Sequence, residues 1–163
     1  PKMSFGTGHH QTTRLVSKLM LNMDLKGKKL LDMGTGTGVL AILAEKRGAA
    51  PITAIDNFEW AVENTDENAE ANDCTNITAM HGDAELLPGM SFDVVLANIN
   101  RNVLLQDMKT YIETLTPQGR LLISGFFEND FELLNAEATK HGMELVNKVT
   151  EDRWMSCQFQ KLT

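Results

Sequence analysis

The chain has 163 residues, 42% of them hydrophobic and 23% charged, and its formal net charge is −7. This length predicts one domain that can bury a core without metal or disulfide staples, and the composition is that of an ordinary globular protein. The negative charge argues against a nucleic-acid-binding face, which usually needs a cluster of Lys and Arg. It suits either a basic protein substrate or simple solubility.

The sequence gives no sign of a membrane-spanning or secreted protein. No apolar run approaches the roughly 20 residues that span a bilayer, and no signal peptide opens the chain, so we expect a cytoplasmic protein without a membrane partner. Cys74 and Cys157 form no closely spaced ligand pair, and we interpret them as reduced thiols rather than a metal site. Because the chain starts at Pro1 without an initiator Met, we expect it to be cut from a longer protein.

Short β-rich runs alternate with helical stretches along the chain, after a first amphipathic helix over residues 12–23. This alternation predicts a mostly parallel sheet covered by helices on both faces. The expected strands are residues 29–33, 52–55, 77–80, 92–97 and 120–124, and the expected helices between them are residues 39–47, 59–72, 102–115 and 131–141. The helix over 102–115 should stop before Pro117, because the residue before a proline avoids the α region.

The last two β-rich runs, residues 144–149 and 154–160, are separated by too few residues for a helical crossover. They should therefore pair as antiparallel neighbours. Together these patterns predict a single α/β domain over residues 1–163, with a seven-stranded, mostly parallel sheet that ends in an antiparallel hairpin.

A glycine-rich loop lies between the first predicted strand and the helix after it, where residues 31–38 read Leu-Asp-Met-Gly-Thr-Gly-Thr-Gly. Glycines allow a tight turn and let a ligand lie against bare backbone. The nicotinamide pattern Gly-x-Gly-x-x-Gly would need its third glycine at Val39, but here it is Gly38. A loop of this form resembles the one that methyltransferases use for S-adenosylmethionine, which has no pyrophosphate. We therefore predict that Gly34 and Gly36 contact this cofactor, an ordinary turn being the alternative.

Polar residues after the second and third strands are further candidates for cofactor binding. Asp56 closes the second strand, where a carboxylate can accept hydrogen bonds from both ribose hydroxyls. A helix-capping Asp is the alternative, and we include its neighbour Asn57 in the prediction. Residues 82–84, Gly-Asp-Ala, follow the third strand, where the backbone N–H of Ala84 could read the adenine edge or simply form a turn.

The fourth strand ends in Ala-Asn-Ile-Asn over residues 97–100, and carboxyl ends of strands face the ligand crevice in such sheets. Amine methyltransferases have a similar Asn/Asp-Pro-Pro-aromatic loop, whose side-chain oxygen and a backbone carbonyl orient the attacking amine. The prolines and the aromatic residue are missing here, but Asn98 matches and Ile99 offers its carbonyl. We predict that Asn98 is catalytic and that no general base is needed, because desolvation can keep an amine neutral. A strand-end Asn in a turn is the alternative.

Residues 5–13, Phe-Gly-Thr-Gly-His-His-Gln-Thr-Thr, resemble the Phe-Gly-Thr-Gly-x-His-x-Thr-Thr stretch of the bacterial ribosomal protein methyltransferase family PrmA. Residues 34–42, 95–99, 121–125 and 152–154 are also similar to this family, with departures at His9, Gln11 and residues 57–59. The resemblance implies the Rossmann-like class I methyltransferase fold. It also implies S-adenosylmethionine as the cofactor, and N-methylation of lysine and N-terminal amines on the eleventh protein of the large ribosomal subunit.

The resemblance further implies that Thr13, Gly34, Asp56 and Asn98 contact the cofactor, and that a separate substrate-docking domain lies upstream. A physical reading supports Thr13, because Thr12 or Thr13 can cap the first helix, whose N-terminus attracts the cofactor carboxylate. The alternatives are a class I enzyme for RNA guanine, protein glutamine or a small-molecule amine, a nicotinamide oxidoreductase, or an inactive cofactor-binding module. The sequence does not indicate an oligomeric state.

Overall fold

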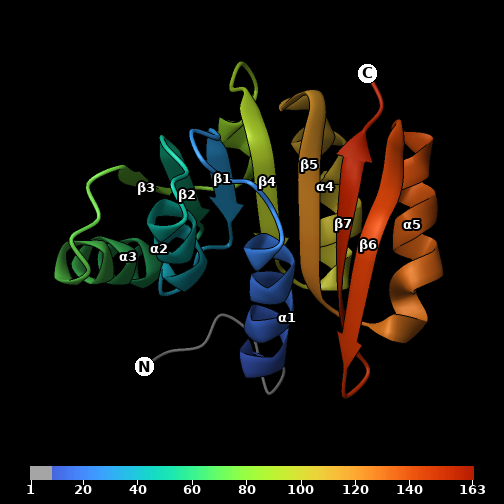
Figure 1. The fold of residues 1–163 in the computed structure, drawn as a ribbon, viewed down its shortest axis with the longest axis horizontal. Coiled ribbons are helices and arrows are strands. Elements are labelled where there is room, and N and C mark those ends of the chain that lie inside the picture. Colours follow the sequence, from blue (N-terminus) through green and yellow to red (C-terminus); the bar gives the residue numbers. More distant parts are fainter. Residues whose placement is uncertain (1–8) are drawn as a thin grey trace.

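The computed structural model of the protein describes residues 9–163, with side chains from residue 10 onward. The Phe-Gly-Thr-Gly motif at residues 5–8 lies outside the described residues. Seven strands form one sheet in the order β3-β2-β1-β4-β5-β7-β6 (Figure 1). They are β1 Leu30–Met33, β2 Ile52–Asp56, β3 Ile77–His81, β4 Phe92–Asn98, β5 Leu115–Phe127, β6 Met143–Glu151 and β7 Trp154–Lys161.

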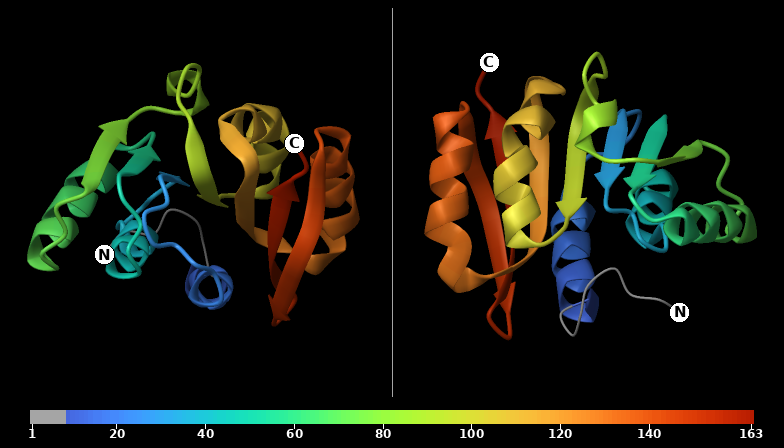
Figure 2. Two further views of the ribbon diagram at one scale, coloured as in Figure 1. Left: turned by 45° about the horizontal axis from the view of Figure 1, so that its top comes forward. Right: turned by 180° about the vertical axis from the view of Figure 1, so that it is seen from behind.

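Helices cover both faces of the sheet, as the sequence predicts. They are α1 His9–Leu21, α2 Val39–Lys46, α3 Glu59–Ala71, α4 Arg101–Glu113 and α5 Phe131–Lys140. The views in Figure 2 show α1, α2 and α3 on one face, and α4 and α5 on the other. The chain therefore has three layers, with the sheet in the middle.

Strand pairing confirms the predicted sheet. β1 lies between β2 and β4 and is parallel to both, while β7 is antiparallel to β5 and to β6. All four residues of β1 are buried, because helices cover both of its faces. The carboxyl ends of β1, β2 and β4 consequently meet at one edge, and the loops that follow them lie side by side there.

Two apolar cores lie on the two faces of the sheet. One is centred on α4 and α5 and contains Leu31, Val95 and Tyr111, and the other is under α1 and α2 and contains Leu30, Leu96 and Leu122. Neighbouring residues of one strand thus point into different cores. Both cysteines are free and buried. Among the described residues, no helix is long and apolar enough to cross a membrane.

The first helix begins earlier than the sequence predicts, and this corrects the capping hypothesis. α1 starts at His9, so Thr12 and Thr13 lie inside its first turns rather than at its N-cap. The Thr12 carbonyl accepts a hydrogen bond from the Ser124 hydroxyl at 3.1 Å, which fastens this turn to β5. The prediction that Thr12 or Thr13 caps the helix is therefore wrong, because both residues already have helical backbone.

The fifth strand is also longer than predicted, because it spans residues 115–127 and contains Pro117. Its pairing with β4 shifts register between Phe92 and Val94, opposite the stretch that holds the proline. A proline is tolerated at such an irregularity because no ladder hydrogen bond needs its missing N–H. α4 ends at Glu113, two residues before the predicted end and well before the proline.

Candidate functional site

A pocket of about 300 Å³ lies at the carboxyl ends of the parallel strands. Five of the seven predicted site residues line it: Gly34, Asp56, Asn57, Ala84 and Asn98. Gly36 and Thr13 are not part of its wall. The structure therefore brings together residues that follow four different strands, as the edge of a parallel sheet requires.

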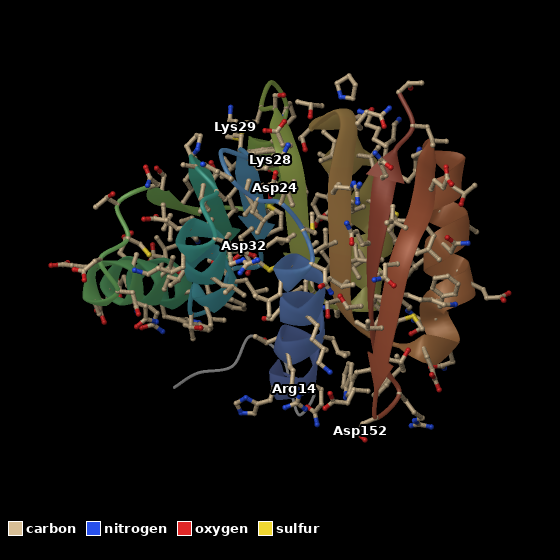
Figure 3. All side chains as sticks on the ribbon, viewed as in Figure 1. Arg14, Asp24, Lys28, Lys29, Asp32 and Asp152 are labelled. Atoms are coloured by element: carbon tan, nitrogen blue, oxygen red, sulfur yellow. The ribbon has the colours of Figure 1, made fainter. Side chains whose placement is uncertain are left out.

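A second hollow of about 520 Å³ lies at the other end of the sheet and contains none of the predicted site residues. Its lining includes Asp24, Lys28 and Arg120. Figure 3 shows Asp24 and Lys28 at the end of the molecule opposite Arg14. Because ligands of open α/β sheets bind at the carboxyl ends of the strands, the smaller pocket is the candidate site.

The glycine loop turns sharply between β1 and α2. Gly34, Gly36 and Gly38 have φ angles of +72°, +59° and +84°, which an L side chain rarely adopts. The N–H groups of Gly34 and Thr35 both donate to the Ile55 carbonyl, at 2.8 and 3.2 Å. The loop thus lies against the end of β2, and Gly34 leaves bare backbone at the wall of the pocket.

Asp56 connects the glycine loop to the turn after β2. One carboxylate oxygen accepts from the Gly36 N–H at 2.9 Å and the other from the Phe58 N–H at 3.1 Å. Only 4% of the residue is exposed. Asp56 is thus a local backbone acceptor that also lines the pocket. The N-cap of α3 is Phe58 rather than Asp56, and the ribose contact stays a prediction. Each oxygen keeps acceptor capacity, since a carboxylate offers about four lone-pair sites.

Asp32, the acid of the glycine motif, is buried beneath the loop with 1% exposure (Figure 3). The Thr35 hydroxyl donates to its Oδ2 at 2.8 Å, while Oδ1 has no hydrogen-bond partner among the described residues. Burial raises the pKa of the Asp32 carboxyl to about 7; the Thr35 hydrogen bond opposes this shift and the Asp56 carboxylate adds to it. Asp32 therefore holds a proton more readily than an exposed carboxyl does.

The turn after β4 presents an unsatisfied acceptor. Asn98 is 7% exposed, and its Oδ1 has no hydrogen-bond partner among the described residues. The Ile99 N–H donates to the Ser124 carbonyl at 3.1 Å, and the Asn100 side chain accepts from the Val103 N–H at 3.1 Å. The second asparagine is thus the N-cap of α4. A buried oxygen without a partner is costly, so Asn98 is poised for a ligand.

The comparisons with known proteins identify the family. The family profile described as Ribosomal protein L11 methyltransferase (PrmA) matches residues 1–162. The chain belongs to the PrmA family. A ribosomal protein L11 methyltransferase from Bacteroides fragilis is 51% identical over 160 residues, which cover 98% of this chain. These residues cover only 57% of that relative, so the chain spans little more than half of the curated relative's length.

Solved structures agree with membership of the PrmA family. The ribosomal protein L11 methylase of Lactobacillus delbrueckii subsp. bulgaricus superposes with a TM-score of 0.90 at 26% identity, over 96% of this chain and 81% of that one. A putative RNA methyltransferase from Pyrococcus horikoshii gives a TM-score of 0.81 at 17% identity, over 100% of this chain and 91% of that one. The latter likeness shows the fold alone, which is the class I methyltransferase fold.

Two features of this PrmA-family site escaped the sequence analysis. Tyr111 of α4 reaches the pocket wall although it is fully buried, and its hydroxyl has no hydrogen-bond partner among the described residues. Burial, followed by the Asp107 and Asp83 carboxylates, raises the pKa of its phenol above the ordinary value. It therefore stays a neutral donor. The other feature is the Asn100 cap, which an asparagine directly before a predicted helix could have signalled.

Thr13 stays a prediction as a cofactor contact. Its hydroxyl is buried within α1 and has no hydrogen-bond partner among the described residues. α1 packs along β5 and β7, and the Arg14 side chain pairs with Glu151 of β6. The hydroxyl of Thr13 is thus a buried polar group without a partner among the described residues, on a helix that packs against the sheet. The helix N-terminus argument no longer supports its role, since Thr13 is not the cap.

Proposed function

We propose that this chain binds S-adenosylmethionine in the 300 Å³ pocket and transfers its methyl group to lysine and N-terminal amines of a large-subunit ribosomal protein. The observation that carries the proposal is the buried, unpartnered Oδ1 of Asn98 in a pocket that Gly34 and Asp56 also line. A ribosomal substrate also implies that the protein acts in the cytoplasm.

The residues of the pocket fit the cofactor. Gly34 exposes backbone to it, the Gly36 N–H holds Asp56 in place, and the Asp56 carboxylate keeps acceptor capacity for two ribose hydroxyls. Asn57 and Ala84 also line the pocket, and we assign them to the adenine end of the cofactor. The Thr13 hydroxyl, unpartnered in α1, is available for the amino-acid end of the cofactor.

The bound cofactor would supply a methyl group that its sulfonium has already activated. The contribution of the protein is then alignment, which is worth orders of magnitude in rate for a well-oriented pair. The Asn98 Oδ1 would accept an N–H of the incoming amine and turn its lone pair toward the methyl group. A lysine amine must first lose its proton to solvent, and apolar neighbours such as Ile99 and Val103 lower its pKa by desolvation.

The charge of the chain supports a basic protein substrate. Its formal net charge is −7, with 22 acidic and 15 basic residues. Opposite charge steers encounter with a basic ribosomal protein and repels an RNA phosphate backbone. This difference favours the protein amine over the RNA guanine alternative. We further propose that a separate docking domain outside these residues delivers the ribosomal protein to the pocket.

Two measurements test the proposal. Isothermal titration should show that the chain binds S-adenosylhomocysteine and does not bind NADH. The reverse result would contradict the proposed methyltransferase function. Transfer of labelled methyl groups to the purified ribosomal protein should then fall sharply in Asn98→Ala. The matched control is Asn147→Ala on β6, which lines the hollow at the other end of the sheet. Equal rates of methyl transfer by the two variants would show that the Asn98 side chain takes no part in the reaction.

A further inference from the structure

The turn that carries Asn98 is held from two sides by glycines. A Cβ atom built on Gly34 would lie 3.1 Å from Cγ1 of Ile99. A Cβ atom built on Gly125 would lie 2.6 Å from the Ile99 carbonyl oxygen, 3.0 Å from its carbon and 3.2 Å from its nitrogen. The Ile99 side chain therefore rests on the glycine loop after β1, and its peptide rests directly on the backbone of β5.

Gly125 can take this place because it is a bulge. The pairing of β5 with β7 runs regularly to Ser124, skips Gly125, and resumes at Phe126. The φ angle of Gly125 is +95°, which only glycine adopts without strain. Bulges bend a strand and are frequent beside active sites, where they redirect the chain. Just before the bulge, the Ser124 carbonyl accepts the Ile99 N–H at 3.1 Å.

We propose that Gly125 is a positioning residue for methyl transfer, which rests on the proposed function. Its missing side chain lets the Ile99 peptide pack against β5. The Asn98 Oδ1, in the residue just before Ile99, is thereby fixed as an acceptor for an N–H group of a neutral amine. Related amine methyltransferase loops have two prolines at this point, and prolines fix a backbone by themselves. Here the Ser124 hydrogen bond, the Asn100 cap and the Gly125 contact hold the turn instead.

This arrangement places Gly125 away from the proposed ribose contacts of the cofactor. Asp56 ends β2 and the Gly36 N–H that holds it follows β1, whereas the atoms nearest to a Cβ on Gly125 all belong to the Ile99 peptide. A methyl group at residue 125 would displace the Ile99 peptide, because a 2.6 Å contact with backbone must be relieved. We expect the rate of transfer to fall while the affinity for the cofactor product changes much less.

The test compares Gly125→Ala with Gly142→Ala. Gly142 also has a left-handed φ, +85°, but a Cβ there would meet nothing within 4 Å. The two glycines thus have similar positive φ angles, but only an added Cβ at Gly125 would meet the Ile99 backbone. With cofactor saturating, transfer to the ribosomal protein should fall about tenfold or more in Gly125→Ala, because a misplacement of about 1 Å can cost 100-fold. The dissociation constant for S-adenosylhomocysteine should change much less than the rate, because the Gly36–Asp56 contact stays in place.

A second readout does not depend on activity. In the amide NMR spectrum, the Ile99 signal should move in Gly125→Ala while the Gly36 signal stays in place, and Gly142→Ala should leave both unchanged. An unmoved Ile99 amide, or equal transfer by the two alanine variants, would overturn the proposal. Absence of S-adenosylhomocysteine binding by the wild-type chain would instead overturn the proposed function.

If Gly125→Ala fails to fold, the other side of the same turn decides. Asn100→Ala removes the cap of α4, whereas Asn100→Asp keeps an oxygen for the Val103 N–H. Transfer should fall in the alanine variant and recover in the aspartate variant, with cofactor affinity kept in both. Wild-type transfer by Asn100→Ala would show that the turn needs no such support, and the role given to Gly125 would be wrong.

Discussion

The carboxylate of Asp56 accepts a hydrogen bond from the Gly36 N–H at 2.9 Å, which joins the end of β2 to the glycine loop after β1. Its other oxygen holds the Phe58 N–H, so one side chain shapes both loops that line the pocket. The acid is therefore preorganised: the same contacts that stabilise the loops fix the carboxylate where the ribose is expected.

Asp56→Ala should weaken cofactor binding more than it weakens folding. Two ribose hydroxyls would lose an ionised acceptor, and hydrogen bonds to charged groups are worth about 1.5–3 kcal/mol each. Isothermal titration with S-adenosylhomocysteine measures the affinity, and thermal unfolding measures the stability. Asp66→Asn, an exposed change on α3, is the control. An unchanged dissociation constant in a folded Asp56→Ala protein would remove Asp56 from the cofactor site.

Asp32 should make stability fall as the pH rises. Burial raises the pKa of the Asp32 carboxyl to about 7 in the folded chain, above the unfolded value near 4. The folded state then binds the proton more tightly, so the stabilisation is complete below about pH 4 and is lost as the pH rises through about 7. Urea unfolding between pH 5 and pH 8 measures this slope.

Asp32→Asn should flatten that slope, because the amide cannot titrate and its oxygen can still accept the Thr35 hydroxyl. The difference between wild type and variant isolates Asp32 from the other titrating groups of the chain. Parallel pH profiles for the two proteins would show that the Asp32 carboxyl does not titrate in this range.

Local patterns were sufficient to predict most of this fold. Strands and helices alternate with clear periodicity, and Gly34 and Asp56 stand at strand ends, where the topology of a parallel sheet brings them together. The start of α1 was missed because Thr12 and Thr13 are typical capping residues, whereas tertiary packing of Thr12 against Ser124 keeps them helical. The strand around Pro117 was missed because a proline argues against strand pairing, and only the register shift accommodates it.

The remaining parts of the site depend on tertiary structure. Tyr111 lies on the apolar face of its helix, so the local sequence predicts a core residue. No local pattern indicates that its side chain also lines the pocket. The contact between Gly125 and Ile99 joins a bulge in β5 to the turn after β4, and no spacing rule predicts where a bulge falls.

Tyr111→Phe should stabilise the cofactor-free chain. The hydroxyl is buried without a partner among the described residues, and an unsatisfied buried group costs about 1–3 kcal/mol. Removing it should raise the free energy of unfolding by about 1 kcal/mol, or the melting temperature by roughly 2–4 °C for a chain of this size. Differential scanning calorimetry provides the measurement. A clear loss of stability would show that the hydroxyl has a partner in solution.

Tyr111 also offers a spectroscopic check, because it is the single tyrosine of the chain. Burial, together with the Asp107 and Asp83 carboxylates, raises the pKa of its phenol. The ultraviolet signal of phenolate should therefore appear only at a pH above the ordinary tyrosine range, or together with unfolding. Ionisation at the ordinary pH in a folded chain would contradict the buried position.

Cofactor binding and docking of the ribosomal protein should depend on different parts of the full-length enzyme. The 163-residue chain should bind the cofactor and yet methylate the ribosomal protein slowly, because catalysis on a large substrate uses remote binding energy to position the reacting group. Asn98 can orient an amine only after that amine has been delivered. The matched Bacteroides fragilis relative has further segments, since the alignment covers 57% of its length.

Joining those segments to this chain should therefore raise the ratio kcat/KM for the ribosomal protein, while the affinity for S-adenosylhomocysteine stays constant. Asn98→Ala in the joined protein should abolish most of the gain, which shows that the same site is used. The control is the joined segments alone, which should bind the ribosomal protein without methylating it. Equal transfer by the short chain and the joined protein would place the docking surface within these 163 residues.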